Sequence, residues 1–194
     1  MQTALLILAL TVLATVTAIT FSARQRESRA LRALVNRRHL NFSPEDLIDL
    51  HERYYRLSII RRGHSRFAWN LLYGSADEGL VSLFCYRCDV GFGVNQTHRA
   101  WWLGVMETPR PRAAWQAERQ PFVDPLQTEK HERKLGSFLV RANEESTLDR
   151  LASANLQGLL EDFPLVEHAE VRGQLVCVAA PYDRNTRTPE QLLD

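Results

Sequence analysis

An uninterrupted apolar run stands at the start of this sequence. Residues Ala4 to Phe21 contain no charged residue, no proline and no glycine. At 1.5 Å per residue, a helix of this length is about 27 Å long, close to the roughly 30 Å hydrocarbon core of a bilayer. The run therefore predicts a single transmembrane helix. We expect the chain to be bound to a membrane through residues 4–21.

Positive charge follows this run and does not precede it. Met1, Gln2 and Thr3 carry no basic side chain, whereas six arginines follow closely: Arg24, Arg26, Arg29, Arg32, Arg37 and Arg38. Basic flanks stay in the cytoplasm, which favours a single-pass protein of the inner membrane with its N-terminus outside and its domain cytoplasmic. The alternative is a signal peptide cleaved after Val16-Thr17-Ala18, which would export the domain.

Small residues recur along the same run. Thr11, Ala14, Thr15 and Ala18 form small-xxx-small pairs, a pattern that lets two membrane helices approach closely. A weak homodimer through this face is compatible with the sequence.

The composition leaves room for one globular domain beyond the run. The chain has 194 residues, of which 45% are hydrophobic and 24% charged. Residues 22–66 hold 11 arginines against five acidic residues, but the part beyond Arg66 is net acidic, which argues against nucleic acid as a partner. The odd count of three cysteines argues against a disulfide-stapled secreted domain.

Helices are predicted near the beginning and near the end of the chain beyond the apolar run. Leu31, Leu34 and Val35 recur at helical spacing amid arginines, which predicts a basic juxtamembrane helix. Ser43 as N-cap and Pro44 at the first helical position predict a further helix through about Tyr55. Later on, a helix is expected to begin at Ser146, and a short helical turn at Thr188.

Alternating apolar residues predict antiparallel strands between these helices. Strands are expected over 67–73, 80–86, 98–106 and 137–140, and a terminal hairpin is expected to join 166–171 to 174–180 through Arg172-Gly173. Four prolines make 108–133 a surface excursion with at most one short edge strand around Trp115. Trp101 and Trp102 should point to opposite faces of the sheet, one into the core and the other toward a partner or the membrane surface.

These elements define an α+β chain with one globular domain, a mainly antiparallel sheet and two or three helices. The expected divisions are a transmembrane anchor over 1–23, a basic juxtamembrane helix over 24–38, the α+β domain over 39–183 and a C-terminal tail over 184–194.

Four segments in this order carry a family resemblance: NFSPEDLIDLHERYYRL, RRGHSRFAWNLLYG, LVSLFCYRCDVGFGVNQTHRAWW and FLVRANEESTLDRL. With the N-terminal run, they resemble an uncharacterised family of bacterial membrane-anchored proteins. The resemblance covers about residues 39–180 and implies a compact α+β domain of unknown function, with no catalytic residues to carry across. Cys85 and Cys88 stand where the family pattern has a polar residue and an aromatic one.

Cys85-Tyr86-Arg87-Cys88 has the spacing of a zinc or redox motif. In a strand, however, residues three apart point to opposite faces and lie about 10 Å apart, too far for one metal ion or a disulfide. We therefore expect both cysteines to be buried strand residues, with metal binding or redox chemistry only if the chain turns there.

The basic stretch at 61–66 is the strongest candidate binding site in the sequence. Arg61, Arg62, His64 and Arg66 in one loop are suited to bind anionic headgroups through arginine forks, although a solvated turn explains them as well.

Other motifs are weak, and we expect no cofactor and no metal site. Glu144-Glu145 fits a helix start, and Asn95-Gln96-Thr97 fits a turn. No catalytic constellation is recognised, so a non-enzymatic interaction or scaffold module, with a membrane or cytoplasmic protein as a partner, is favoured. The alternatives are a module that binds lipid headgroups at the membrane surface and an enzyme of unrecognised type that uses scattered residues: His64, His98, His131 and Asp89.

Overall fold

The computed structural model describes residues 25–119, 129–183 and 187–193. The apolar run at 4–21, with its small-xxx-small pairs and the cleavage alternative, lies outside these ranges. No helix within them is long and apolar enough to cross a membrane.

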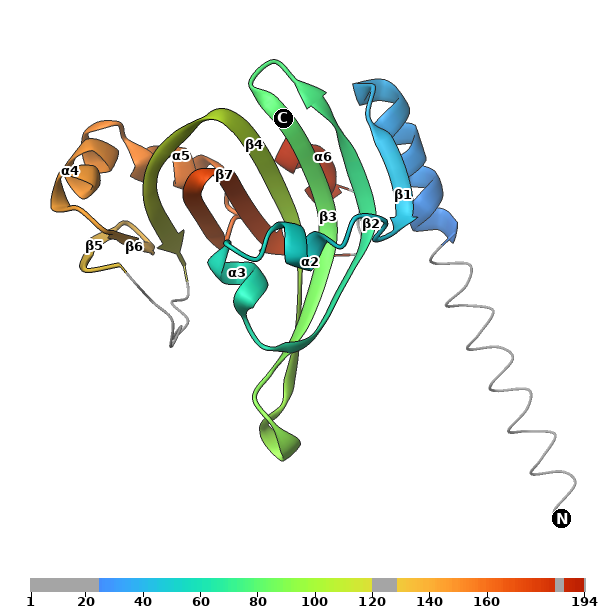
Figure 1. The fold of residues 1–194 in the computed structure, drawn as a ribbon, viewed down its shortest axis with the longest axis horizontal. Coiled ribbons are helices and arrows are strands. Elements are labelled where there is room, and N and C mark those ends of the chain that lie inside the picture. The colour runs from blue at the N-terminus through green and yellow to red at the C-terminus, as the bar shows by residue number, and fades with distance from the viewer. Residues whose placement is uncertain (1–24, 120–128, 184–186, 194) are drawn as a thin grey trace, which may run out of the picture.

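The described residues form one curved sheet of seven strands, all paired antiparallel (Figure 1). The strand order is β1-β2-β3-β4-β6-β5, and β7 pairs with β4. The predicted α+β class with a mainly antiparallel sheet is therefore confirmed. The strands are β1 (Asn41–Glu45), β2 (His64–Ala76), β3 (Gly79–Val90), β4 (Thr97–Glu118), β5 (His131–Leu135), β6 (Phe138–Ala142) and β7 (His168–Pro181).

Helices are more numerous and shorter than the two or three expected. Residues 25–38 are helical, and the helix expected from Ser146 is divided at Asn155, whose backbone is left-handed with φ 55°. The others are α2 (Leu50–Arg53), α3 (Ser58–Arg61), α4 (Glu145–Ser153), α5 (Leu156–Asp162) and α6 (Arg187–Leu193), with a 3₁₀ turn η1 (Gly93–Asn95).

Both faces of the sheet are covered. On one face α2 and α3 pack Leu50, Tyr54 and Ile60 against β3. On the other face, the 25–38 helix packs its apolar stripe on the sheet in a cluster of buried residues: Leu31, Leu34, Val35, Leu72, Leu83, Cys85 and Trp102. A third cluster lies under α4 and α5, at the far end of β4. Because strand residues alternate between faces, β3 and β4 supply apolar side chains to both layers.

The helix predicted from Ser43 is wrong in its first turn. Ser43 and Pro44 belong to β1, where the Ser43 hydroxyl donates to the Glu45 carbonyl (2.7 Å). Pro44 is tolerated because β1 is the terminal strand in the described sheet order, and a missing N–H costs little there. The helix start lies further on, where Asp46 accepts the backbone N–H of Leu50 (3.0 Å).

The surface excursion predicted over 108–133 is also wrong over 108–118, because β4 continues to Glu118, and its residues 120–128 lie outside the described ranges. Pro109 and Pro111 follow Glu107, where the β3 ladder ends and the β7 register skips to Arg112, so neither proline has to donate a ladder hydrogen bond. Beyond this interruption Trp115 pairs with both β6 and β7 and lies in the interior of the sheet, not at an edge. The strand β5 was not predicted.

The predicted terminal hairpin is one continuous strand, β7. Gly173 does not form a turn between two strands; it lies opposite Arg112 with a positive φ of 62°, and the register shifts on either side. The glycine therefore forms a bulge that lets β7 follow the bend of β4.

The two adjacent tryptophans do point to opposite faces, as predicted. Trp101 joins the cluster under α2 and α3, and Trp102 joins the cluster under the 25–38 helix. Both are buried, so neither is exposed to a partner or a membrane surface.

Candidate functional site

The basic residues of the 61–66 stretch divide between the interior and the surface. Arg62 turns inward and pairs with Glu118 on β4, both almost fully buried. Arg66 is exposed and donates to the carbonyls of Arg61 (2.7 Å) and Gly63 (3.1 Å). Arg62 is therefore committed to the interior, while headgroup contact by Arg61, His64 and Arg66 stays a prediction.

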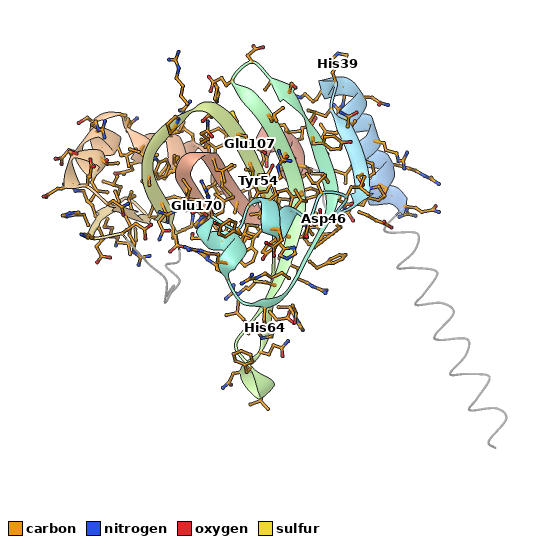
Figure 2. The ribbon with its side chains drawn as sticks, viewed as in Figure 1. His39, Asp46, Tyr54, His64, Glu107 and Glu170 are labelled. Carbon is orange, nitrogen blue, oxygen red and sulfur yellow. The ribbon has the colours of Figure 1, made fainter. Side chains whose placement is uncertain are left out.

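A buried charged network lies where α3 meets β4, β6 and β7. Glu118 pairs with Arg62 and with Arg141 (3.2 Å). Glu170, labelled in Figure 2, accepts the backbone N–H groups of Ser58 (2.9 Å) and Ile59 (3.2 Å), so it caps the first turn of α3. We call this group the buried network; its members are Arg62, Glu118, Arg141, His168, Glu170 and Arg172.

His168 lies between the two carboxylates of the network. Its Nε2 is 3.0 Å from Glu170 and its Nδ1 is 3.4 Å from an Arg62 nitrogen. Burial lowers the pKa of His168, against the opposing effect of Glu170. A neutral ring with its proton on Nε2 donates to Glu170 and accepts from Arg62 at Nδ1. Nδ1 also lies 3.2 Å from Glu118, and the Arg62 guanidinium, which contacts both of these acceptors, offsets their repulsion.

The charges of this network balance within the protein. Arg172 also pairs with the buried side chain of Glu129, so three arginines face three buried glutamates around a neutral histidine. Arg141 contacts the exposed Glu132 as well (3.5 Å). Each group is held by partners in the protein, which fits a structural role better than a reactive one. The network was missed in the sequence, although His168, Glu170 and Arg172 occupy alternate positions of a strand and so share one face.

This network predicts that acid destabilises the fold. His168 with a lowered pKa is protonated more readily in the unfolded chain, so stability falls as the pH drops through about 6.5. Burial alone would raise the pKa of Glu170, but the hydrogen bonds from His168 and from the Ser58 backbone N–H, together with the charge of Arg172, lower it to about 2, so further stability is lost below about pH 4.5. Urea unfolding at several pH values is expected to give a decreasing free energy of unfolding from pH 7 to pH 4.

The matched variants for this experiment are His168→Asn and His131→Asn, since His131 is exposed on β5. The first should flatten the dependence between pH 7 and pH 5.5, and the second should leave it unchanged. Equal stability of the native chain at these two pH values would contradict the assigned state of His168.

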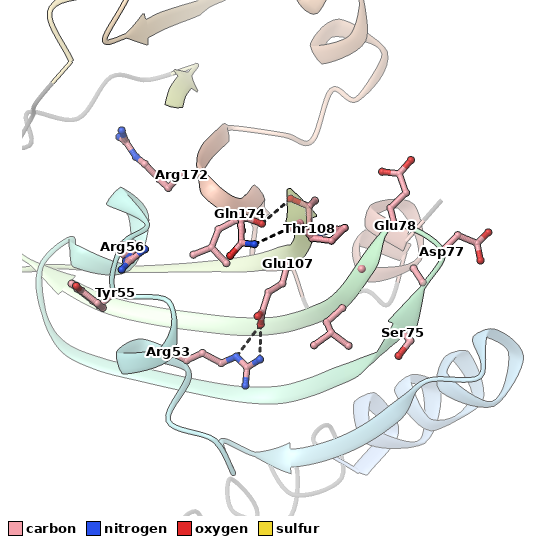
Figure 3. Close-up of a pocket in the computed structure, with 15 residues that line it drawn as sticks. Arg53, Tyr55, Arg56, Ser75, Asp77, Glu78, Glu107, Thr108, Arg172 and Gln174 are labelled. Carbon is pink, nitrogen blue, oxygen red and sulfur yellow. Dashed lines mark hydrogen bonds and ion pairs between the residues drawn. The ribbon is translucent and has the colours of Figure 1, made fainter. Parts of the chain in front are cut away.

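An open hollow of about 810 Å³ lies beside α2, bordered by the turn between β2 and β3 and by the bent part of β4 (Figure 3). Arg53, Tyr55 and Arg56 line one side of it, and Asp77 and Glu78 line another. Gln174 of β7 donates to the carbonyl of Pro109 (3.0 Å), which fixes the wall near the proline interruption of β4.

Glu107 is a carboxylate on the wall of this hollow, and three hydrogen bonds converge on its Oε1. Arg53 donates to it through Nε (2.9 Å) and Nη2 (2.6 Å), and the Tyr54 hydroxyl donates to it as well (2.9 Å). Burial raises the pKa of Tyr54 to about 12, and the hydrogen bond to Glu107 raises the pKa of Arg53. Neither Tyr54 nor Arg53 therefore exchanges a proton easily at neutral pH.

The cysteine pair lies on opposite faces of β3, as predicted. Cys85 packs with Trp102 under the 25–38 helix, whereas Cys88 packs in the cluster under α2 and α3. Both thiols are free and buried, and burial raises the pKa of each. This arrangement does not form a site for a metal ion or a disulfide between them.

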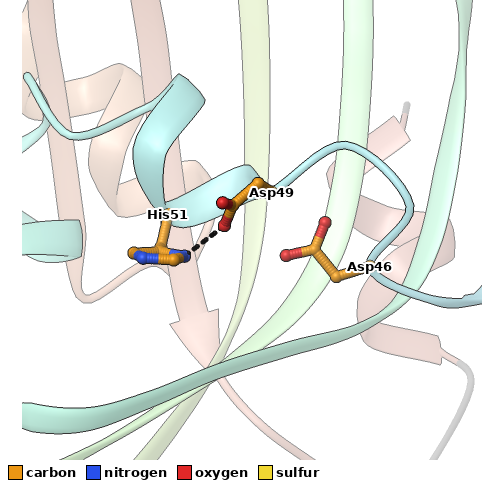
Figure 4. A group of neighbouring side chains, drawn as sticks. All are labelled: Asp46, Asp49 and His51. Carbon is orange, nitrogen blue, oxygen red and sulfur yellow. Dashed lines mark ion pairs between the residues drawn. The ribbon is translucent and has the colours of Figure 1, made fainter.

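Asp46, Asp49 and His51 form a small group that the sequence analysis did not select (Figure 4). Their ligand atoms lie within 4.8 Å of one another. The Asp46 carboxylate already accepts the N–H groups of Ile48 and Leu50, and Asp49 contacts His51 at 2.6 Å. The group is explained by the start of α2, and we assign no ion to it.

These features define an α+β protein with a curved antiparallel sheet, a balanced buried network and an open polar hollow. No protein-family model matches the sequence, and no curated protein matches it either. The structure is similar to the crystal structure of the mycobacterial trehalose monomycolate transport factor A, TtfA, with a TM-score of 0.67 over 88% of each chain. The sequence identity is 11%, so the similarity is one of fold alone.

Proposed function

We propose that this chain is a membrane-tethered, non-enzymatic accessory module that holds a partner protein in the hollow beside α2. The observation that carries the proposal is the hollow itself, in which the carboxylate of Glu107 is neutralised by Arg53 and Tyr54. A preformed concave surface that is lined by charged and aromatic side chains is suited to binding.

The chemistry at the mouth of the hollow fits a protein partner. Tyr55 and Leu80 are 57% and 49% exposed, and Arg56 is exposed with no ion pair among the described residues. Exposed tyrosine and arginine beside an aliphatic side chain are typical of the residues that dominate protein interfaces.

Tethering is supported by the apolar run at 4–21 and by the arginines that follow it. These features favour a position at the cytoplasmic face of the inner membrane, with the N-terminus outside. The fold similarity to TtfA, which is described as a transport factor, supports an accessory role over a catalytic one.

Site-specific photo-crosslinking in intact membranes tests this proposal. A photoreactive residue at Tyr55 of the full chain is expected to give a discrete crosslinked product, whereas one at Leu159, which is equally exposed on α5, is expected to give none. Arg56→Glu should abolish the product because it reverses a charge at the mouth, and Arg150→Glu on α4 should leave it unchanged.

Equal products from positions 55 and 159, or a product insensitive to Arg56→Glu, would reject the hollow as the binding site. Turnover of a substrate by the purified full chain would reject the non-enzymatic reading, and release of the chain by a carbonate wash would reject the tether.

A further inference from the structure

The hairpin between β3 and β4 extends beyond the rest of the sheet. β3 and β4 pair as far as Val90 and Thr97, and β2 accompanies them only from His64, which lies opposite Asp89. The turn that follows, Gly91–Asn95, projects from the body of the molecule and ends in η1 (Figure 1). We call these five residues the hairpin tip.

The tip presents apolar side chains to solvent. Phe92 is 80% exposed, and Val94 is fully exposed. A turn needs neither side chain for its geometry, and small polar residues are the usual occupants of such positions. These two residues therefore indicate a surface that is covered by something apolar.

The tip is held in one shape by its neighbours. His64, labelled at the neck of the hairpin in Figure 2, stacks on Phe92 at 4.7 Å, and its Nε2 donates to the Gly91 carbonyl (2.8 Å). Asp89 accepts from His98 (2.6 Å) and from the side-chain amide of Gln96 (2.9 Å). Gly91 has a φ of 84°, and a side chain there would meet the Asn95 carbonyl at 2.7 Å.

Three arginines stand behind the tip without an acidic partner. Arg66, Arg87 and Arg99 are all exposed and form no ion pair among the described residues. Arg99 is paired with Cys88, so the two side chains lie on the same face of the hairpin. Arg87 is the neighbour of Cys88 in the strand and therefore projects from the opposite face. Arg87 and Arg99 are each five residues from an exposed apolar residue of the tip, which is at most about 17 Å along the chain at 3.3 Å per residue, and less where the chain turns through η1.

This spacing matches a membrane surface, in which a layer of lipid phosphates lies above a layer of apolar acyl chains. An apolar group buried about 5–10 Å into the boundary between headgroups and acyl chains leaves long basic side chains at the level of the phosphates. Arginine binds phosphate through two parallel N–H bonds, and the neighbouring Phe67, which is 56% exposed, adds apolar surface at the same level.

The hairpin points to the side of the molecule on which the 25–38 helix begins (Figure 1). In Figure 1 the 25–38 helix begins at its lower end, and the hairpin tip points toward the same lower side of the molecule. A membrane holding the run at 4–21 would lie on that side, so this step rests on the tether of the proposed function.

We propose that the β3–β4 hairpin inserts Phe92 and Val94 into the surface of an anionic phospholipid bilayer, with Arg66, Arg87 and Arg99 bound to lipid phosphates. The hairpin is then a second membrane contact, and it fixes the orientation of the sheet and its hollow relative to the bilayer.

An environment-sensitive fluorophore on Val94→Cys tests this contact. The three native cysteines are buried and should not react in the folded chain. The full chain is reconstituted into vesicles of phosphatidylcholine and phosphatidylglycerol that carry nitroxide-labelled lipid. The matched control is Asp77→Cys in the exposed turn at the other end of β3.

The label at position 94 is expected to shift to shorter emission wavelength and to be quenched by the nitroxide, and the label at position 77 to do neither. Arg87→Gln and Arg99→Gln should each lower the ratio of inserted to free hairpin by about fivefold, and vesicles of phosphatidylcholine alone should lower it further.

Two results would overturn the proposal. One is a label at position 94 that behaves like the label at 77. The other is a blue shift without nitroxide quenching that grows with protein density, which would assign the tip to a second copy of the chain. A carbonate wash tests the tether separately, because a chain without a membrane anchor is released by it. Nitroxide quenching measured before the wash still shows whether the hairpin inserts into the bilayer.

Discussion

Replacing Glu118 by alanine is expected to lower the free energy of unfolding by about 3–5 kcal/mol, because two arginines lose their shared partner inside the protein. Glu118 is 2% exposed and contacts both Arg62 and Arg141. Removal of the carboxylate leaves buried positive charge that water cannot reach. Urea unfolding of the purified chain at pH 7 measures the effect.

Two further variants make this result interpretable. Glu118→Gln keeps the shape and one acceptor oxygen, so its loss should be smaller than that of the alanine variant. Asp149→Ala removes an exposed pair with Arg133 (2.9 Å) in the same part of the fold and should cost less than about 1 kcal/mol. A Glu118→Ala variant no less stable than Asp149→Ala would show that the network does not hold the fold.

Trp102→Ala is expected to cost about 3–5 kcal/mol, because it removes the largest fully buried side chain between the 25–38 helix and the sheet. Trp102 is 1% exposed and packs in the cluster that contains Leu31 and Leu34. The cavity would open directly beneath this helix. Hydrogen exchange of residues 25–38, measured by mass spectrometry together with urea unfolding, should therefore increase more than exchange in α4.

Trp102→Phe serves as the control, since it keeps an aromatic ring and loses only part of the volume and the bond to the Asp183 carbonyl (3.4 Å). It should lie between the native chain and the alanine variant. Uniformly increased exchange in the 25–38 helix and in α4 would mean that Trp102 supports the whole fold and not this helix in particular.

The class of the fold followed from local periodicity, whereas its connections did not. Strands were predicted over Phe67–Tyr73 and Leu80–Tyr86 because apolar residues alternate there. Every second residue of a strand points to the same face of the sheet, so this alternation is typical of a strand. Pro109 was read as a break and Gly173 as part of a turn. Pro109 lies where β4 bends and has no register partner, and Gly173 lies opposite Arg112 in the bulge of β7. Whether a proline ends a strand depends on the partner strand, which local sequence does not contain.

The candidate sites differ in the same way. The arginines at 61–66 were visible as a charge cluster, but the inward turn of Arg62 depends on Glu118, 56 residues later on β4. The hollow depends on Arg53 and Glu107, which are 54 residues apart. The opposite placement of Cys85 and Cys88 needed only the period of one strand and was predicted correctly.

The long strand β4 has a mechanical consequence. It borders β7 along most of its length, while β3 occupies its other side up to Glu107 and β6 from Trp115 onward. The part of the sheet next to β3 and the part next to β6 share both β4 and β7. Removal of either part would therefore leave the other with an unpaired strand edge. A pull transmitted through the 25–38 helix is then carried by β4 into both halves at once. The domain should yield under load in one step, with no half-unfolded stage in between.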